Sequence, residues 1–243
     1  MTRNDGRDPG DLRPITFQRG FTKHAPGSVL ASFGDTRVLC TATYQDSVPP
    51  FLQGKGRGWL TAEYSMLPSS TGTRKSRDRN GKVDGRSVEI QRLIGRSLRA
   101  GIDLEKLGER TVTIDCDVLR ADGGTRTASI TGGWVALTDA VLSITDQDGS
   151  KLFSADNSPL GSGVAAVSVG LVEGQTVLDL DYPEDSSADV DMNVVMTGDG
   201  RFIEVQGGGE GATFDRASLD GLVSLASKGL ERISGIQAEA LAE

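Results

Sequence analysis

Residues 111–127 read TVTIDCDVLRADGGTRT, and this stretch indicates both the fold class and a candidate site. Apolar and polar side chains alternate from Thr111 to Val118, which predicts a strand with one buried face. Apolar residues then recur at helical spacing, at Ile130, Trp134, Leu137 and Val141. We therefore predict a strand that is connected to a helix by the turn at residues 120–127.

This turn contains the residue types that bind an oxyanion. Gly123 and Gly124 allow the backbone to approach a ligand closely, and the first N–H groups of the following helix are free to donate. Arg126 adds a planar cation with paired donors. Glycine also occurs in such turns for purely steric reasons, so an anion site and a tight turn are both open interpretations of the motif alone.

The charges of the chain are unevenly distributed. The 243 residues carry a net charge of −8, from 26 basic and 34 acidic residues, which by itself argues against a nucleic-acid partner. Between Arg74 and Arg99, however, nine basic residues accompany three acidic ones, so this segment carries +6 and the remainder −14. A concentrated basic segment on an acidic protein is a local electrostatic feature that the net charge hides.

The first part of the basic segment, residues 74–82, lacks apolar periodicity and predicts a loop. Its arginines Arg74, Arg77 and Arg79 are either ordinary solvated charges or contacts to the phosphates of a single-stranded nucleic acid. The two interpretations differ in the salt dependence that they predict for binding.

The second part of the basic segment predicts a helix over about 87–100 that ends at Gly101. Its apolar face is formed by Ile90, Leu93, Ile94 and Leu98, whereas Arg92, Arg96 and Arg99 share another face. Arg86 lies just before it. Four arginines without a lysine favour forked phosphate recognition over simple solubility.

An acidic segment follows in the second half. Seven carboxylates occur without any cation, at Glu173, Asp179, Asp181, Glu184, Asp185, Asp189 and Asp191. An acidic surface loop is the ordinary interpretation. Against it, Asp191 directly precedes the apolar run 192–196, and crowded carboxylates repel one another unless a cation joins them. A hard ion such as Mg²⁺, held by one or two carboxylates and a substrate phosphate, fits this pattern.

The remaining patterns predict an α+β fold with mixed, largely antiparallel sheets packed against helices. Residues 28–43 predict a hairpin that turns at Gly34-Asp35, and further strands are expected at 60–64, 164–171, 177–182, 193–196 and 202–205, before a closing helix at 215–233. The hairpins at 29–39 and 193–203 align on Gly-Asp-x-Arg, which suggests duplicated halves at about 14–145 and 160–243 of a single domain. Residues 1–13 are polar and predict a tail.

Several classes of protein are disfavoured by composition. Cys40 and Cys116 occupy apolar positions of predicted strands, which predicts that both thiols are buried and reduced. With two cysteines and one histidine, neither a zinc cluster nor a Ser-His-Asp site is expected. No apolar signal core or stretch of transmembrane length is present, so we expect a soluble cytoplasmic protein with no membrane contact. Arginines and backbone N–H groups for anions, with aspartates for a metal or proton, indicate phosphoryl transfer on a nucleic acid.

Three motifs carry a resemblance to a known family. They are residues 82–96 (KVDGRSVEIQRLIGR), residues 122–126 (DGGTR), and residues 181–185 (DYPED) with 191–196 (DMNVVM). From about Arg13 to the last helix, the chain resembles the RNase PH family of phosphorolytic 3′→5′ exoribonucleases, the tRNA nucleotidyltransferases. The resemblance implies the RNase PH-like fold of duplicated halves, assembled as a homohexamer from three dimers.

The resemblance also implies an activity and a site. The family uses inorganic phosphate as co-substrate, with Mg²⁺, to release nucleoside diphosphates from the 3′ ends of tRNA precursors and other RNAs. It implies phosphate binding by Arg86, Gly124, Thr125 and Arg126. Asp185 and Asp191 are implied at the reaction centre, where Asp185 either protonates the departing 3′ oxygen or shares a metal with Asp191. RNA contacts are expected at Arg74, Arg77, Arg79, Arg92, Arg96 and Arg99.

One departure and two alternatives accompany this prediction. After Gly207 the family commonly has Thr-Ala, whereas this chain has Gly208-Gly209, and we expect an altered loop geometry with activity retained. A non-catalytic RNA-binding ring subunit is the first alternative, although such subunits typically lose the phosphate arginines or the aspartates that are present here. A nucleotide-binding regulator is the second, and it predicts tight mononucleotide binding that is indifferent to RNA length.

Overall fold

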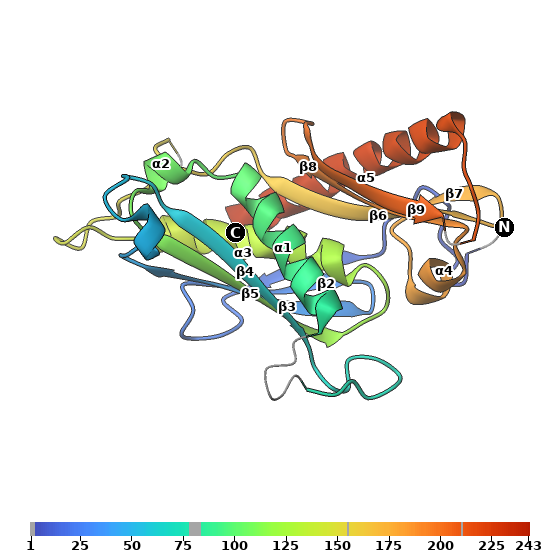
Figure 1. Cartoon of the computed structure of the whole chain (residues 1–243), viewed down its shortest axis with the longest axis horizontal. Helices are drawn as coiled ribbons and strands as arrows, with labels where there is room; N and C mark the ends of the chain where they lie inside the picture. Colours follow the sequence, from blue (N-terminus) through green and yellow to red (C-terminus); the bar gives the residue numbers. More distant parts are fainter. Residues whose placement is uncertain (1–2, 78–83, 155, 210) are drawn as a thin grey trace.

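Figure 1 shows the computed structural model of the chain, which describes residues 3–77, 84–154, 156–209 and 211–243. Two sheets pack with helices between and over them, so the predicted α+β class is confirmed. The first sheet has the order β1-β2-β3-β5-β4, with bounds β1 Ile15–Arg19, β2 Gly27–Phe33, β3 Thr36–Gln45, β4 Trp59–Met66 and β5 Thr111–Arg120. The second has the order β7-β6-β8-β9, with bounds β6 Val164–Val172, β7 Gln175–Leu178, β8 Val190–Thr197 and β9 Phe202–Gly209.

The helices occupy the spaces beside these sheets. They are α1 Gly85–Ala100, α2 Leu104–Leu107, α3 Thr125–Ser143, α4 Tyr182–Ser187 and α5 Arg216–Ala242, with a short 3-10 helix at Pro50–Leu52. Helix α3 contacts β2 and β3 of the first sheet and β6 of the second, so it is buried on nearly every side. Helix α1 packs on β4, and α5 packs on β6 and β7. Among the helices that the structure describes, none is long and apolar enough to cross a bilayer.

The strand and helix of the opening motif form as predicted. In β5 every second residue is buried, from Val112 to Val118, and these side chains face α3 in the core. Strand β5 pairs antiparallel with β3 and parallel with β4, while the other described strand pairs are antiparallel. The hairpins β2–β3 and β8–β9 also form as predicted, and Cys40 and Cys116 are buried free thiols.

The predicted strand at 177–182 is wrong at its end. Strand β7 stops at Leu178, and Asp179 adopts a left-handed backbone conformation with φ of 53°. Asp181 then caps α4, whose Pro183 is suited to a first helical turn and not to a strand. Asp179 and Asp181 therefore do not share a strand face, and the chain instead turns into the site described below.

The predicted tail at residues 1–13 is a packed segment over its described part. Arg3 and Arg13 are buried, and the Leu178 backbone N–H donates to the Pro9 carbonyl at 2.8 Å, next to β7. The segment is polar because it packs mainly by ion pairs with buried carboxylates, and Leu12 adds an apolar contact with the core. The sequence pattern of the segment alone contains no sign of these partners, which lie more than 160 residues away.

Candidate active site

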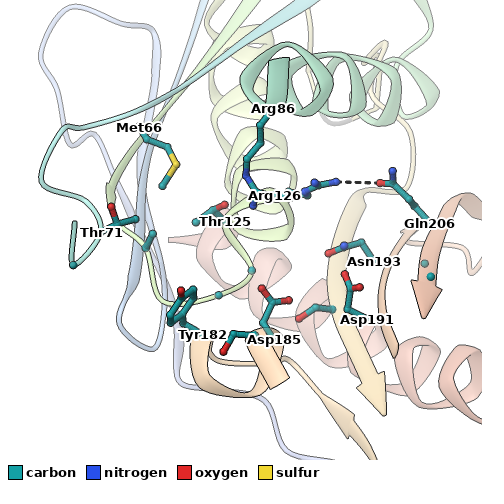
Figure 2. Close-up of a pocket in the computed structure, with 18 of the residues that line it drawn as sticks. Met66, Thr71, Arg86, Thr125, Arg126, Tyr182, Asp185, Asp191, Asn193 and Gln206 are labelled. Atoms are coloured by element: carbon teal, nitrogen blue, oxygen red, sulfur yellow. Dashed lines mark hydrogen bonds between the residues drawn. The ribbon is translucent and has the colours of Figure 1, made fainter. Parts of the chain in front are cut away.

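A pocket of about 820 Å³ lies where the two sheets meet, and both halves of the chain line it. The first half contributes the loop after β4, the start of α1 and the turn before α3. The second half contributes α4, β6, β8 and β9. Its predicted members are Arg86, Gly124, Thr125, Arg126, Asp185 and Asp191. The structure thus gathers all the residues assigned to phosphate binding and catalysis into one pocket (Figure 2).

The glycine turn is shaped for close packing against the second half, through Gly123, and against Arg13, through Gly124. Gly123 and Gly124 both have positive φ, at 72° and 65°. A Cβ on Gly123 would lie 2.6 Å from the carbonyl oxygen of Leu180, and a Cβ on Gly124 would lie 2.9 Å from Nη2 of Arg13. These close contacts show that a larger residue would not fit at either position, so the steric interpretation of the two glycines is correct. Both glycines also line the pocket.

The same turn leaves the N-terminus of α3 open to the pocket. Gly124 is the N-cap of this helix and has no side chain with which to satisfy the first N–H groups. These N–H groups and the helix dipole favour an anion at this position. The Thr125 hydroxyl is held beside them by a 2.9 Å hydrogen bond to the hydroxyl of the buried Tyr64. Burial raises the pKa of Tyr64, although the Thr125 hydrogen bond and the nearby Arg86 oppose this rise.

The two arginines assigned to phosphate differ in how firmly they are held. Arg126 makes a two-pronged ion pair with Glu89 of α1, with both N–O distances at 3.0 Å, and donates to Oε1 of Gln206 of β9 at 3.2 Å (Figure 2). Its side chain thus links the two halves of the molecule. The guanidinium of Arg86 makes no hydrogen bond or ion pair with any residue that the structure describes, and Figure 2 shows it directed toward Arg126. Arg86 therefore supplies a charge whose donors are open to an anion.

The pocket carboxylates come from two elements of the second half. Asp185 lies in the first turn of α4, and Asp191 lies on β8 with Asn193 two residues further along the same face. Figure 2 shows these three side chains beneath the two arginines. The pocket thus places acceptors and possible proton donors opposite a cradle for an anion.

Asp185 and Asp191 are suitable ligands for Mg²⁺. Within the described part of the chain, no group of three or more His, Cys, Asp and Glu side chains is arranged to hold a metal ion. Mg²⁺, however, usually binds proteins through one or two carboxylates, together with water and the phosphates of its substrate. A pair of carboxylates facing an anion cradle fits that donor set, so the two aspartates remain our predicted metal ligands.

Two other carboxylates of the same acidic segment have a structural role. Asp179 is fully buried and accepts hydrogen bonds from Arg13, at 2.7 Å from Nη2 and 3.0 Å from Nε. Glu184 is 1% exposed and pairs with Arg3, with both N–O distances at 2.7 Å. We call Arg3, Arg13, Asp179 and Glu184 the buried ion-pair network. The expected repulsion between crowded carboxylates is thus relieved at Asp179 and Glu184 by arginines of residues 1–13, without a metal.

This network holds the backbone that surrounds the pocket. Arg13 donates to the carbonyl of Asp122 at 2.5 Å, next to the glycine turn. Glu184 accepts from the N–H of Asp181 and completes a capping box at the start of α4. Burial acts to raise the pKa of Glu184, but the hydrogen bonds from Arg3 and from the Asp181 N–H, together with the charges of Arg3 and Arg7, outweigh it and lower that pKa. The network therefore fixes both the anion cradle and the helix that carries Asp185.

The arginines assigned to RNA lie outside this pocket. Arg92, Arg96 and Arg99 line a second, smaller groove between α1 and β4, with Trp59. Arg99 stacks over the Trp59 ring at 5.2 Å and donates to the Leu60 carbonyl, whereas Arg96 pairs with Glu204 of β9. The prediction that Arg92, Arg96 and Arg99 share one face of the helix is therefore confirmed. Arg86, at the start of the same helix, lines the larger pocket instead.

The loop after β4 forms part of the pocket rim. Thr71, Gly72 and Thr73 line the pocket, and Arg74 and Arg77 are exposed just beyond them. Arg79 lies outside the described residues. The structure thus places Arg74 and Arg77 in the loop beside the pocket rim, and their role in RNA binding stays a prediction.

Sequence reasoning missed several pocket residues, including Met66, Tyr182, Asn193 and Gln206. Asn193 was detectable, because it follows Asp191 at strand spacing. Tyr182 lies within the quoted motif 181–185, next to residues that were assigned to the site, whereas Met66 and Gln206 carry no local signal because their positions depend on how the two halves pack. The Gly208 departure also lies in the pocket wall. A Cβ there would meet nothing within 4 Å, so this glycine widens the pocket, whereas a Cβ on Gly209 would collide with the Ala212 carbonyl.

The fold and the pocket define a class of protein, a two-sheet α+β domain with an oxyanion cradle and paired carboxylates between its halves. The chain belongs to the 3′ exoribonuclease family. The model of domain 1 of that family matches residues 11–143, and the model of domain 2 matches residues 163–229. The resemblance to the RNase PH family that the motifs carried is thereby confirmed.

Solved structures agree with this assignment. The chain is similar to rice (Oryza sativa) Rrp46, with a TM-score of 0.80 and 19% identity, over 99% of this chain and 100% of that one. It is similar to a chain of an Archaeoglobus fulgidus exosome with RNA bound to the active site, with a TM-score of 0.77 and 22% identity, over 96% and 91%. It is also similar to a chain of an archaeal exosome core, with a TM-score of 0.75 and 21% identity, over 97% and 91%. At these identities the likeness is one of fold alone.

Proposed function

We propose that this protein is a phosphate-dependent 3′→5′ exoribonuclease that trims the 3′ ends of tRNA precursors and other RNAs. One observation carries the proposal: a single pocket joins Arg86, Arg126 and the open N-terminus of α3 to Asp185 and Asp191. A site for RNA hydrolysis needs a place for water. This pocket has room for water and, beyond that, offers a multidentate cradle for a second oxyanion beside the carboxylates.

The reaction that fits is an in-line displacement. An oxygen of inorganic phosphate attacks the last phosphodiester, the bond from phosphorus to the 3′ oxygen of the preceding ribose breaks, and a nucleoside diphosphate leaves. Arg86, Arg126 and the α3 N–H groups offset the repulsion between the attacking phosphate and the RNA. The shortened RNA needs a proton on its new 3′ hydroxyl, and Asp185 is our candidate for supplying it. Little more than positioning and charge is required of the protein.

We also propose that Asp185 and Asp191 hold Mg²⁺ together with the substrate phosphates. When bound, this ion supplies additional positive charge at the reacting phosphodiester. Asp191 is then the primary metal ligand, and Asp185 is either a ligand or the proton donor.

RNA reaches the pocket as a single strand in this proposal. Arg74, Arg77 and Arg79 contact its backbone near the rim, and Arg92, Arg96 and Arg99 provide a second basic groove. We propose that the groove serves RNA within a homohexameric ring of three dimers. The similar archaeal structures are an exosome core and an exosome with RNA bound to its active site, and they support ring assembly and an RNA partner.

A second candidate function is favoured by the structural relatives more directly than the first. The three similar structures are rice Rrp46 and two archaeal exosome chains, and they support an RNA-binding subunit of a larger assembly, which as the second candidate would act without catalysis. In favour of catalysis, this chain retains both phosphate arginines and both aspartates in one pocket. The two candidates differ in whether bound RNA is shortened.

The test is incubation of the full chain with a 3′-tailed RNA and Mg²⁺, with and without inorganic phosphate, followed by identification of the released nucleotides. Nucleoside diphosphates that form only with phosphate are the expected result. Nucleoside monophosphates, or release that ignores phosphate, would contradict phosphorolysis. RNA that binds but stays intact under both conditions would establish the non-catalytic ring subunit instead.

A further inference from the structure

The wall of the pocket is more polar on one side than on the other. Figure 2 shows Gln206, Asn193 and Asp191 toward one side and Met66, Thr71 and Tyr182 toward the other, with the two arginines and Asp185 between them. A nucleotide is divided in the same way, because its phosphate is charged and its base has two apolar faces. The proposed function accounts for the charged groups and leaves the side of Met66 and Tyr182 without a role.

Tyr182 is the large aromatic residue that the described pocket exposes. The residue is 62% exposed, although it is the first of α4 and the capping-box residues Asp181 and Glu184 on either side of it are buried. No hydrogen bond to its hydroxyl is formed by the residues that the structure describes. The ring is therefore available to a ligand on the pocket side.

The backbone beneath Tyr182 is rigid. Its N–H lies 3.4 Å from Oδ1 of Asp122, and a Cβ on Gly123 would lie 2.9 Å from its nitrogen, so the turn packs directly under this residue. Glu184 anchors the same turn of α4 through the buried ion-pair network. An exposed ring on an anchored backbone loses little conformational entropy when a flat ligand stacks on it.

We propose that Tyr182 forms the base subsite of the pocket and stacks on the 3′-terminal base of the RNA. This proposal rests on the proposed function and deepens it. On the side of Tyr182, Figure 2 labels the thioether of Met66 and the hydroxyl of Thr71 beside the ring, so few of the labelled groups there could read the edge of a base. Stacking accepts every base because every base has a π-face, so the subsite binds single-stranded ends without sequence preference.

The test measures binding in the absence of phosphate, where phosphorolysis does not occur. A 5′-labelled RNA that ends in an ordinary nucleotide is compared with the same RNA carrying an abasic 3′-terminal nucleotide. For the ordinary RNA, Tyr182→Ala weakens affinity about tenfold, whereas Tyr182→Phe binds like the unaltered protein. For the abasic RNA, the unaltered protein and Tyr182→Ala bind equally. Phe202→Ala, which removes an exposed ring of β9 outside the pocket, is the matched control and leaves both affinities unchanged.

Three outcomes would overturn the base subsite. Tyr182→Phe as weak as Tyr182→Ala would assign the role to the hydroxyl. A loss in Tyr182→Ala that persists with the abasic 3′ terminus, and disappears only when the penultimate nucleotide is abasic, would place the ring elsewhere on the strand. A change in the oligomeric state of Tyr182→Ala, measured by light scattering at the same concentration, would show that the ring packs against another subunit. None of these depends on turnover, so a failure of phosphorolysis leaves the test intact.

Discussion

Glu184 and Asp185 are neighbours in one short helix, yet they belong to two different kinds of charged site. Glu184 is part of the buried ion-pair network, in which arginines and carboxylates satisfy one another away from water. Asp185 lines a pocket of about 820 Å³ in which Arg86 and the N-terminus of α3 face solvent. Arginines and carboxylates therefore hold the backbone where they are buried against one another, and are available to a ligand where they line a solvent-filled pocket.

The largest expected difference between the two sites is in stability. We predict that Asp179→Asn lowers the free energy of unfolding by about 3–5 kcal/mol, because it leaves the buried Arg13 without its charge partner. The chemically identical change Asp191→Asn, in the pocket, is expected to alter it by less than about 0.5 kcal/mol. Urea unfolding of both variants measures the contrast. Similar losses in the two variants would show that the sites are not distinct.

The next effect concerns activity, for which we expect substitutions in the pocket to matter more than they do for stability. Arg86→Ala and Arg126→Ala each remove charge-assisted hydrogen bonds to phosphate worth about 1.5–3 kcal/mol, which predicts a phosphorolysis rate at low phosphate lower by about 10- to 150-fold. The control is Arg92→Ala, an arginine of the same helix as Arg86 that lines the second groove. Rates measured against phosphate concentration, beside RNA affinity, test the assignment. Equal losses of RNA affinity and activity would argue against a phosphate role.

A smaller effect is expected on the acid side of the stability profile. The pKa of Glu184 is lowered in the folded protein, so its contribution to stability is present above the ordinary glutamate pKa and is lost as the pH falls through the folded value. We therefore predict that Glu184→Gln is less stable near neutral pH but shows a shallower acid loss. Unfolding measured from about pH 3 to about pH 7 checks this. Parallel profiles for the two proteins would contradict it.

The opposite sign is expected at Asp181. Burial, with the nearby charges of Glu184 and Asp122, raises the pKa of Asp181 despite its backbone hydrogen bond. Its contribution to stability is thus complete at low pH and is lost as the pH rises through the folded value. Asp181→Asn retains a capping oxygen and removes this loss, so we expect its advantage over the unaltered protein to grow with pH. The same unfolding series measures it, and an advantage that grows toward acid would show that the sign is wrong.

The smallest effect concerns the basic rim. Replacing Arg74, Arg77 and Arg79 by alanine is expected to reduce the slope of log affinity against log salt by about 0.7 for each phosphate that the protein no longer neutralises. Arg216→Ala, at the start of α5, removes an exposed arginine away from the pocket and leaves the slope unchanged. RNA binding at several salt concentrations gives the slopes. A slope that stays constant in the triple variant would exclude a role of these arginines at the RNA backbone.

The local sequence pattern predicted helices and strands correctly where the spacing of apolar side chains and the turn residues indicate the same structure. The alternation in β5, the helical spacing in α3 and the Gly-Asp turns of the two hairpins depend on neighbours within a few residues, and each formed as predicted. The prediction failed at Asp179 and in residues 1–13. There the conformation depends on ion pairs between segments more than 160 residues apart, which no local period records.

The class of fold, the family and the residues that line the anion cradle were predictable from the amino-acid sequence, because they depend on local periods and on long, specific motifs. Which charges work together became clear from the packing of the folded chain. This packing assigned Asp179 and Glu184 to support, and Asp185 and Asp191 to the pocket. It also separated Arg86 from Arg92, Arg96 and Arg99 on one helix. The physical reason is that a charge acquires its role from its burial and its partner, and both are set by packing between distant segments.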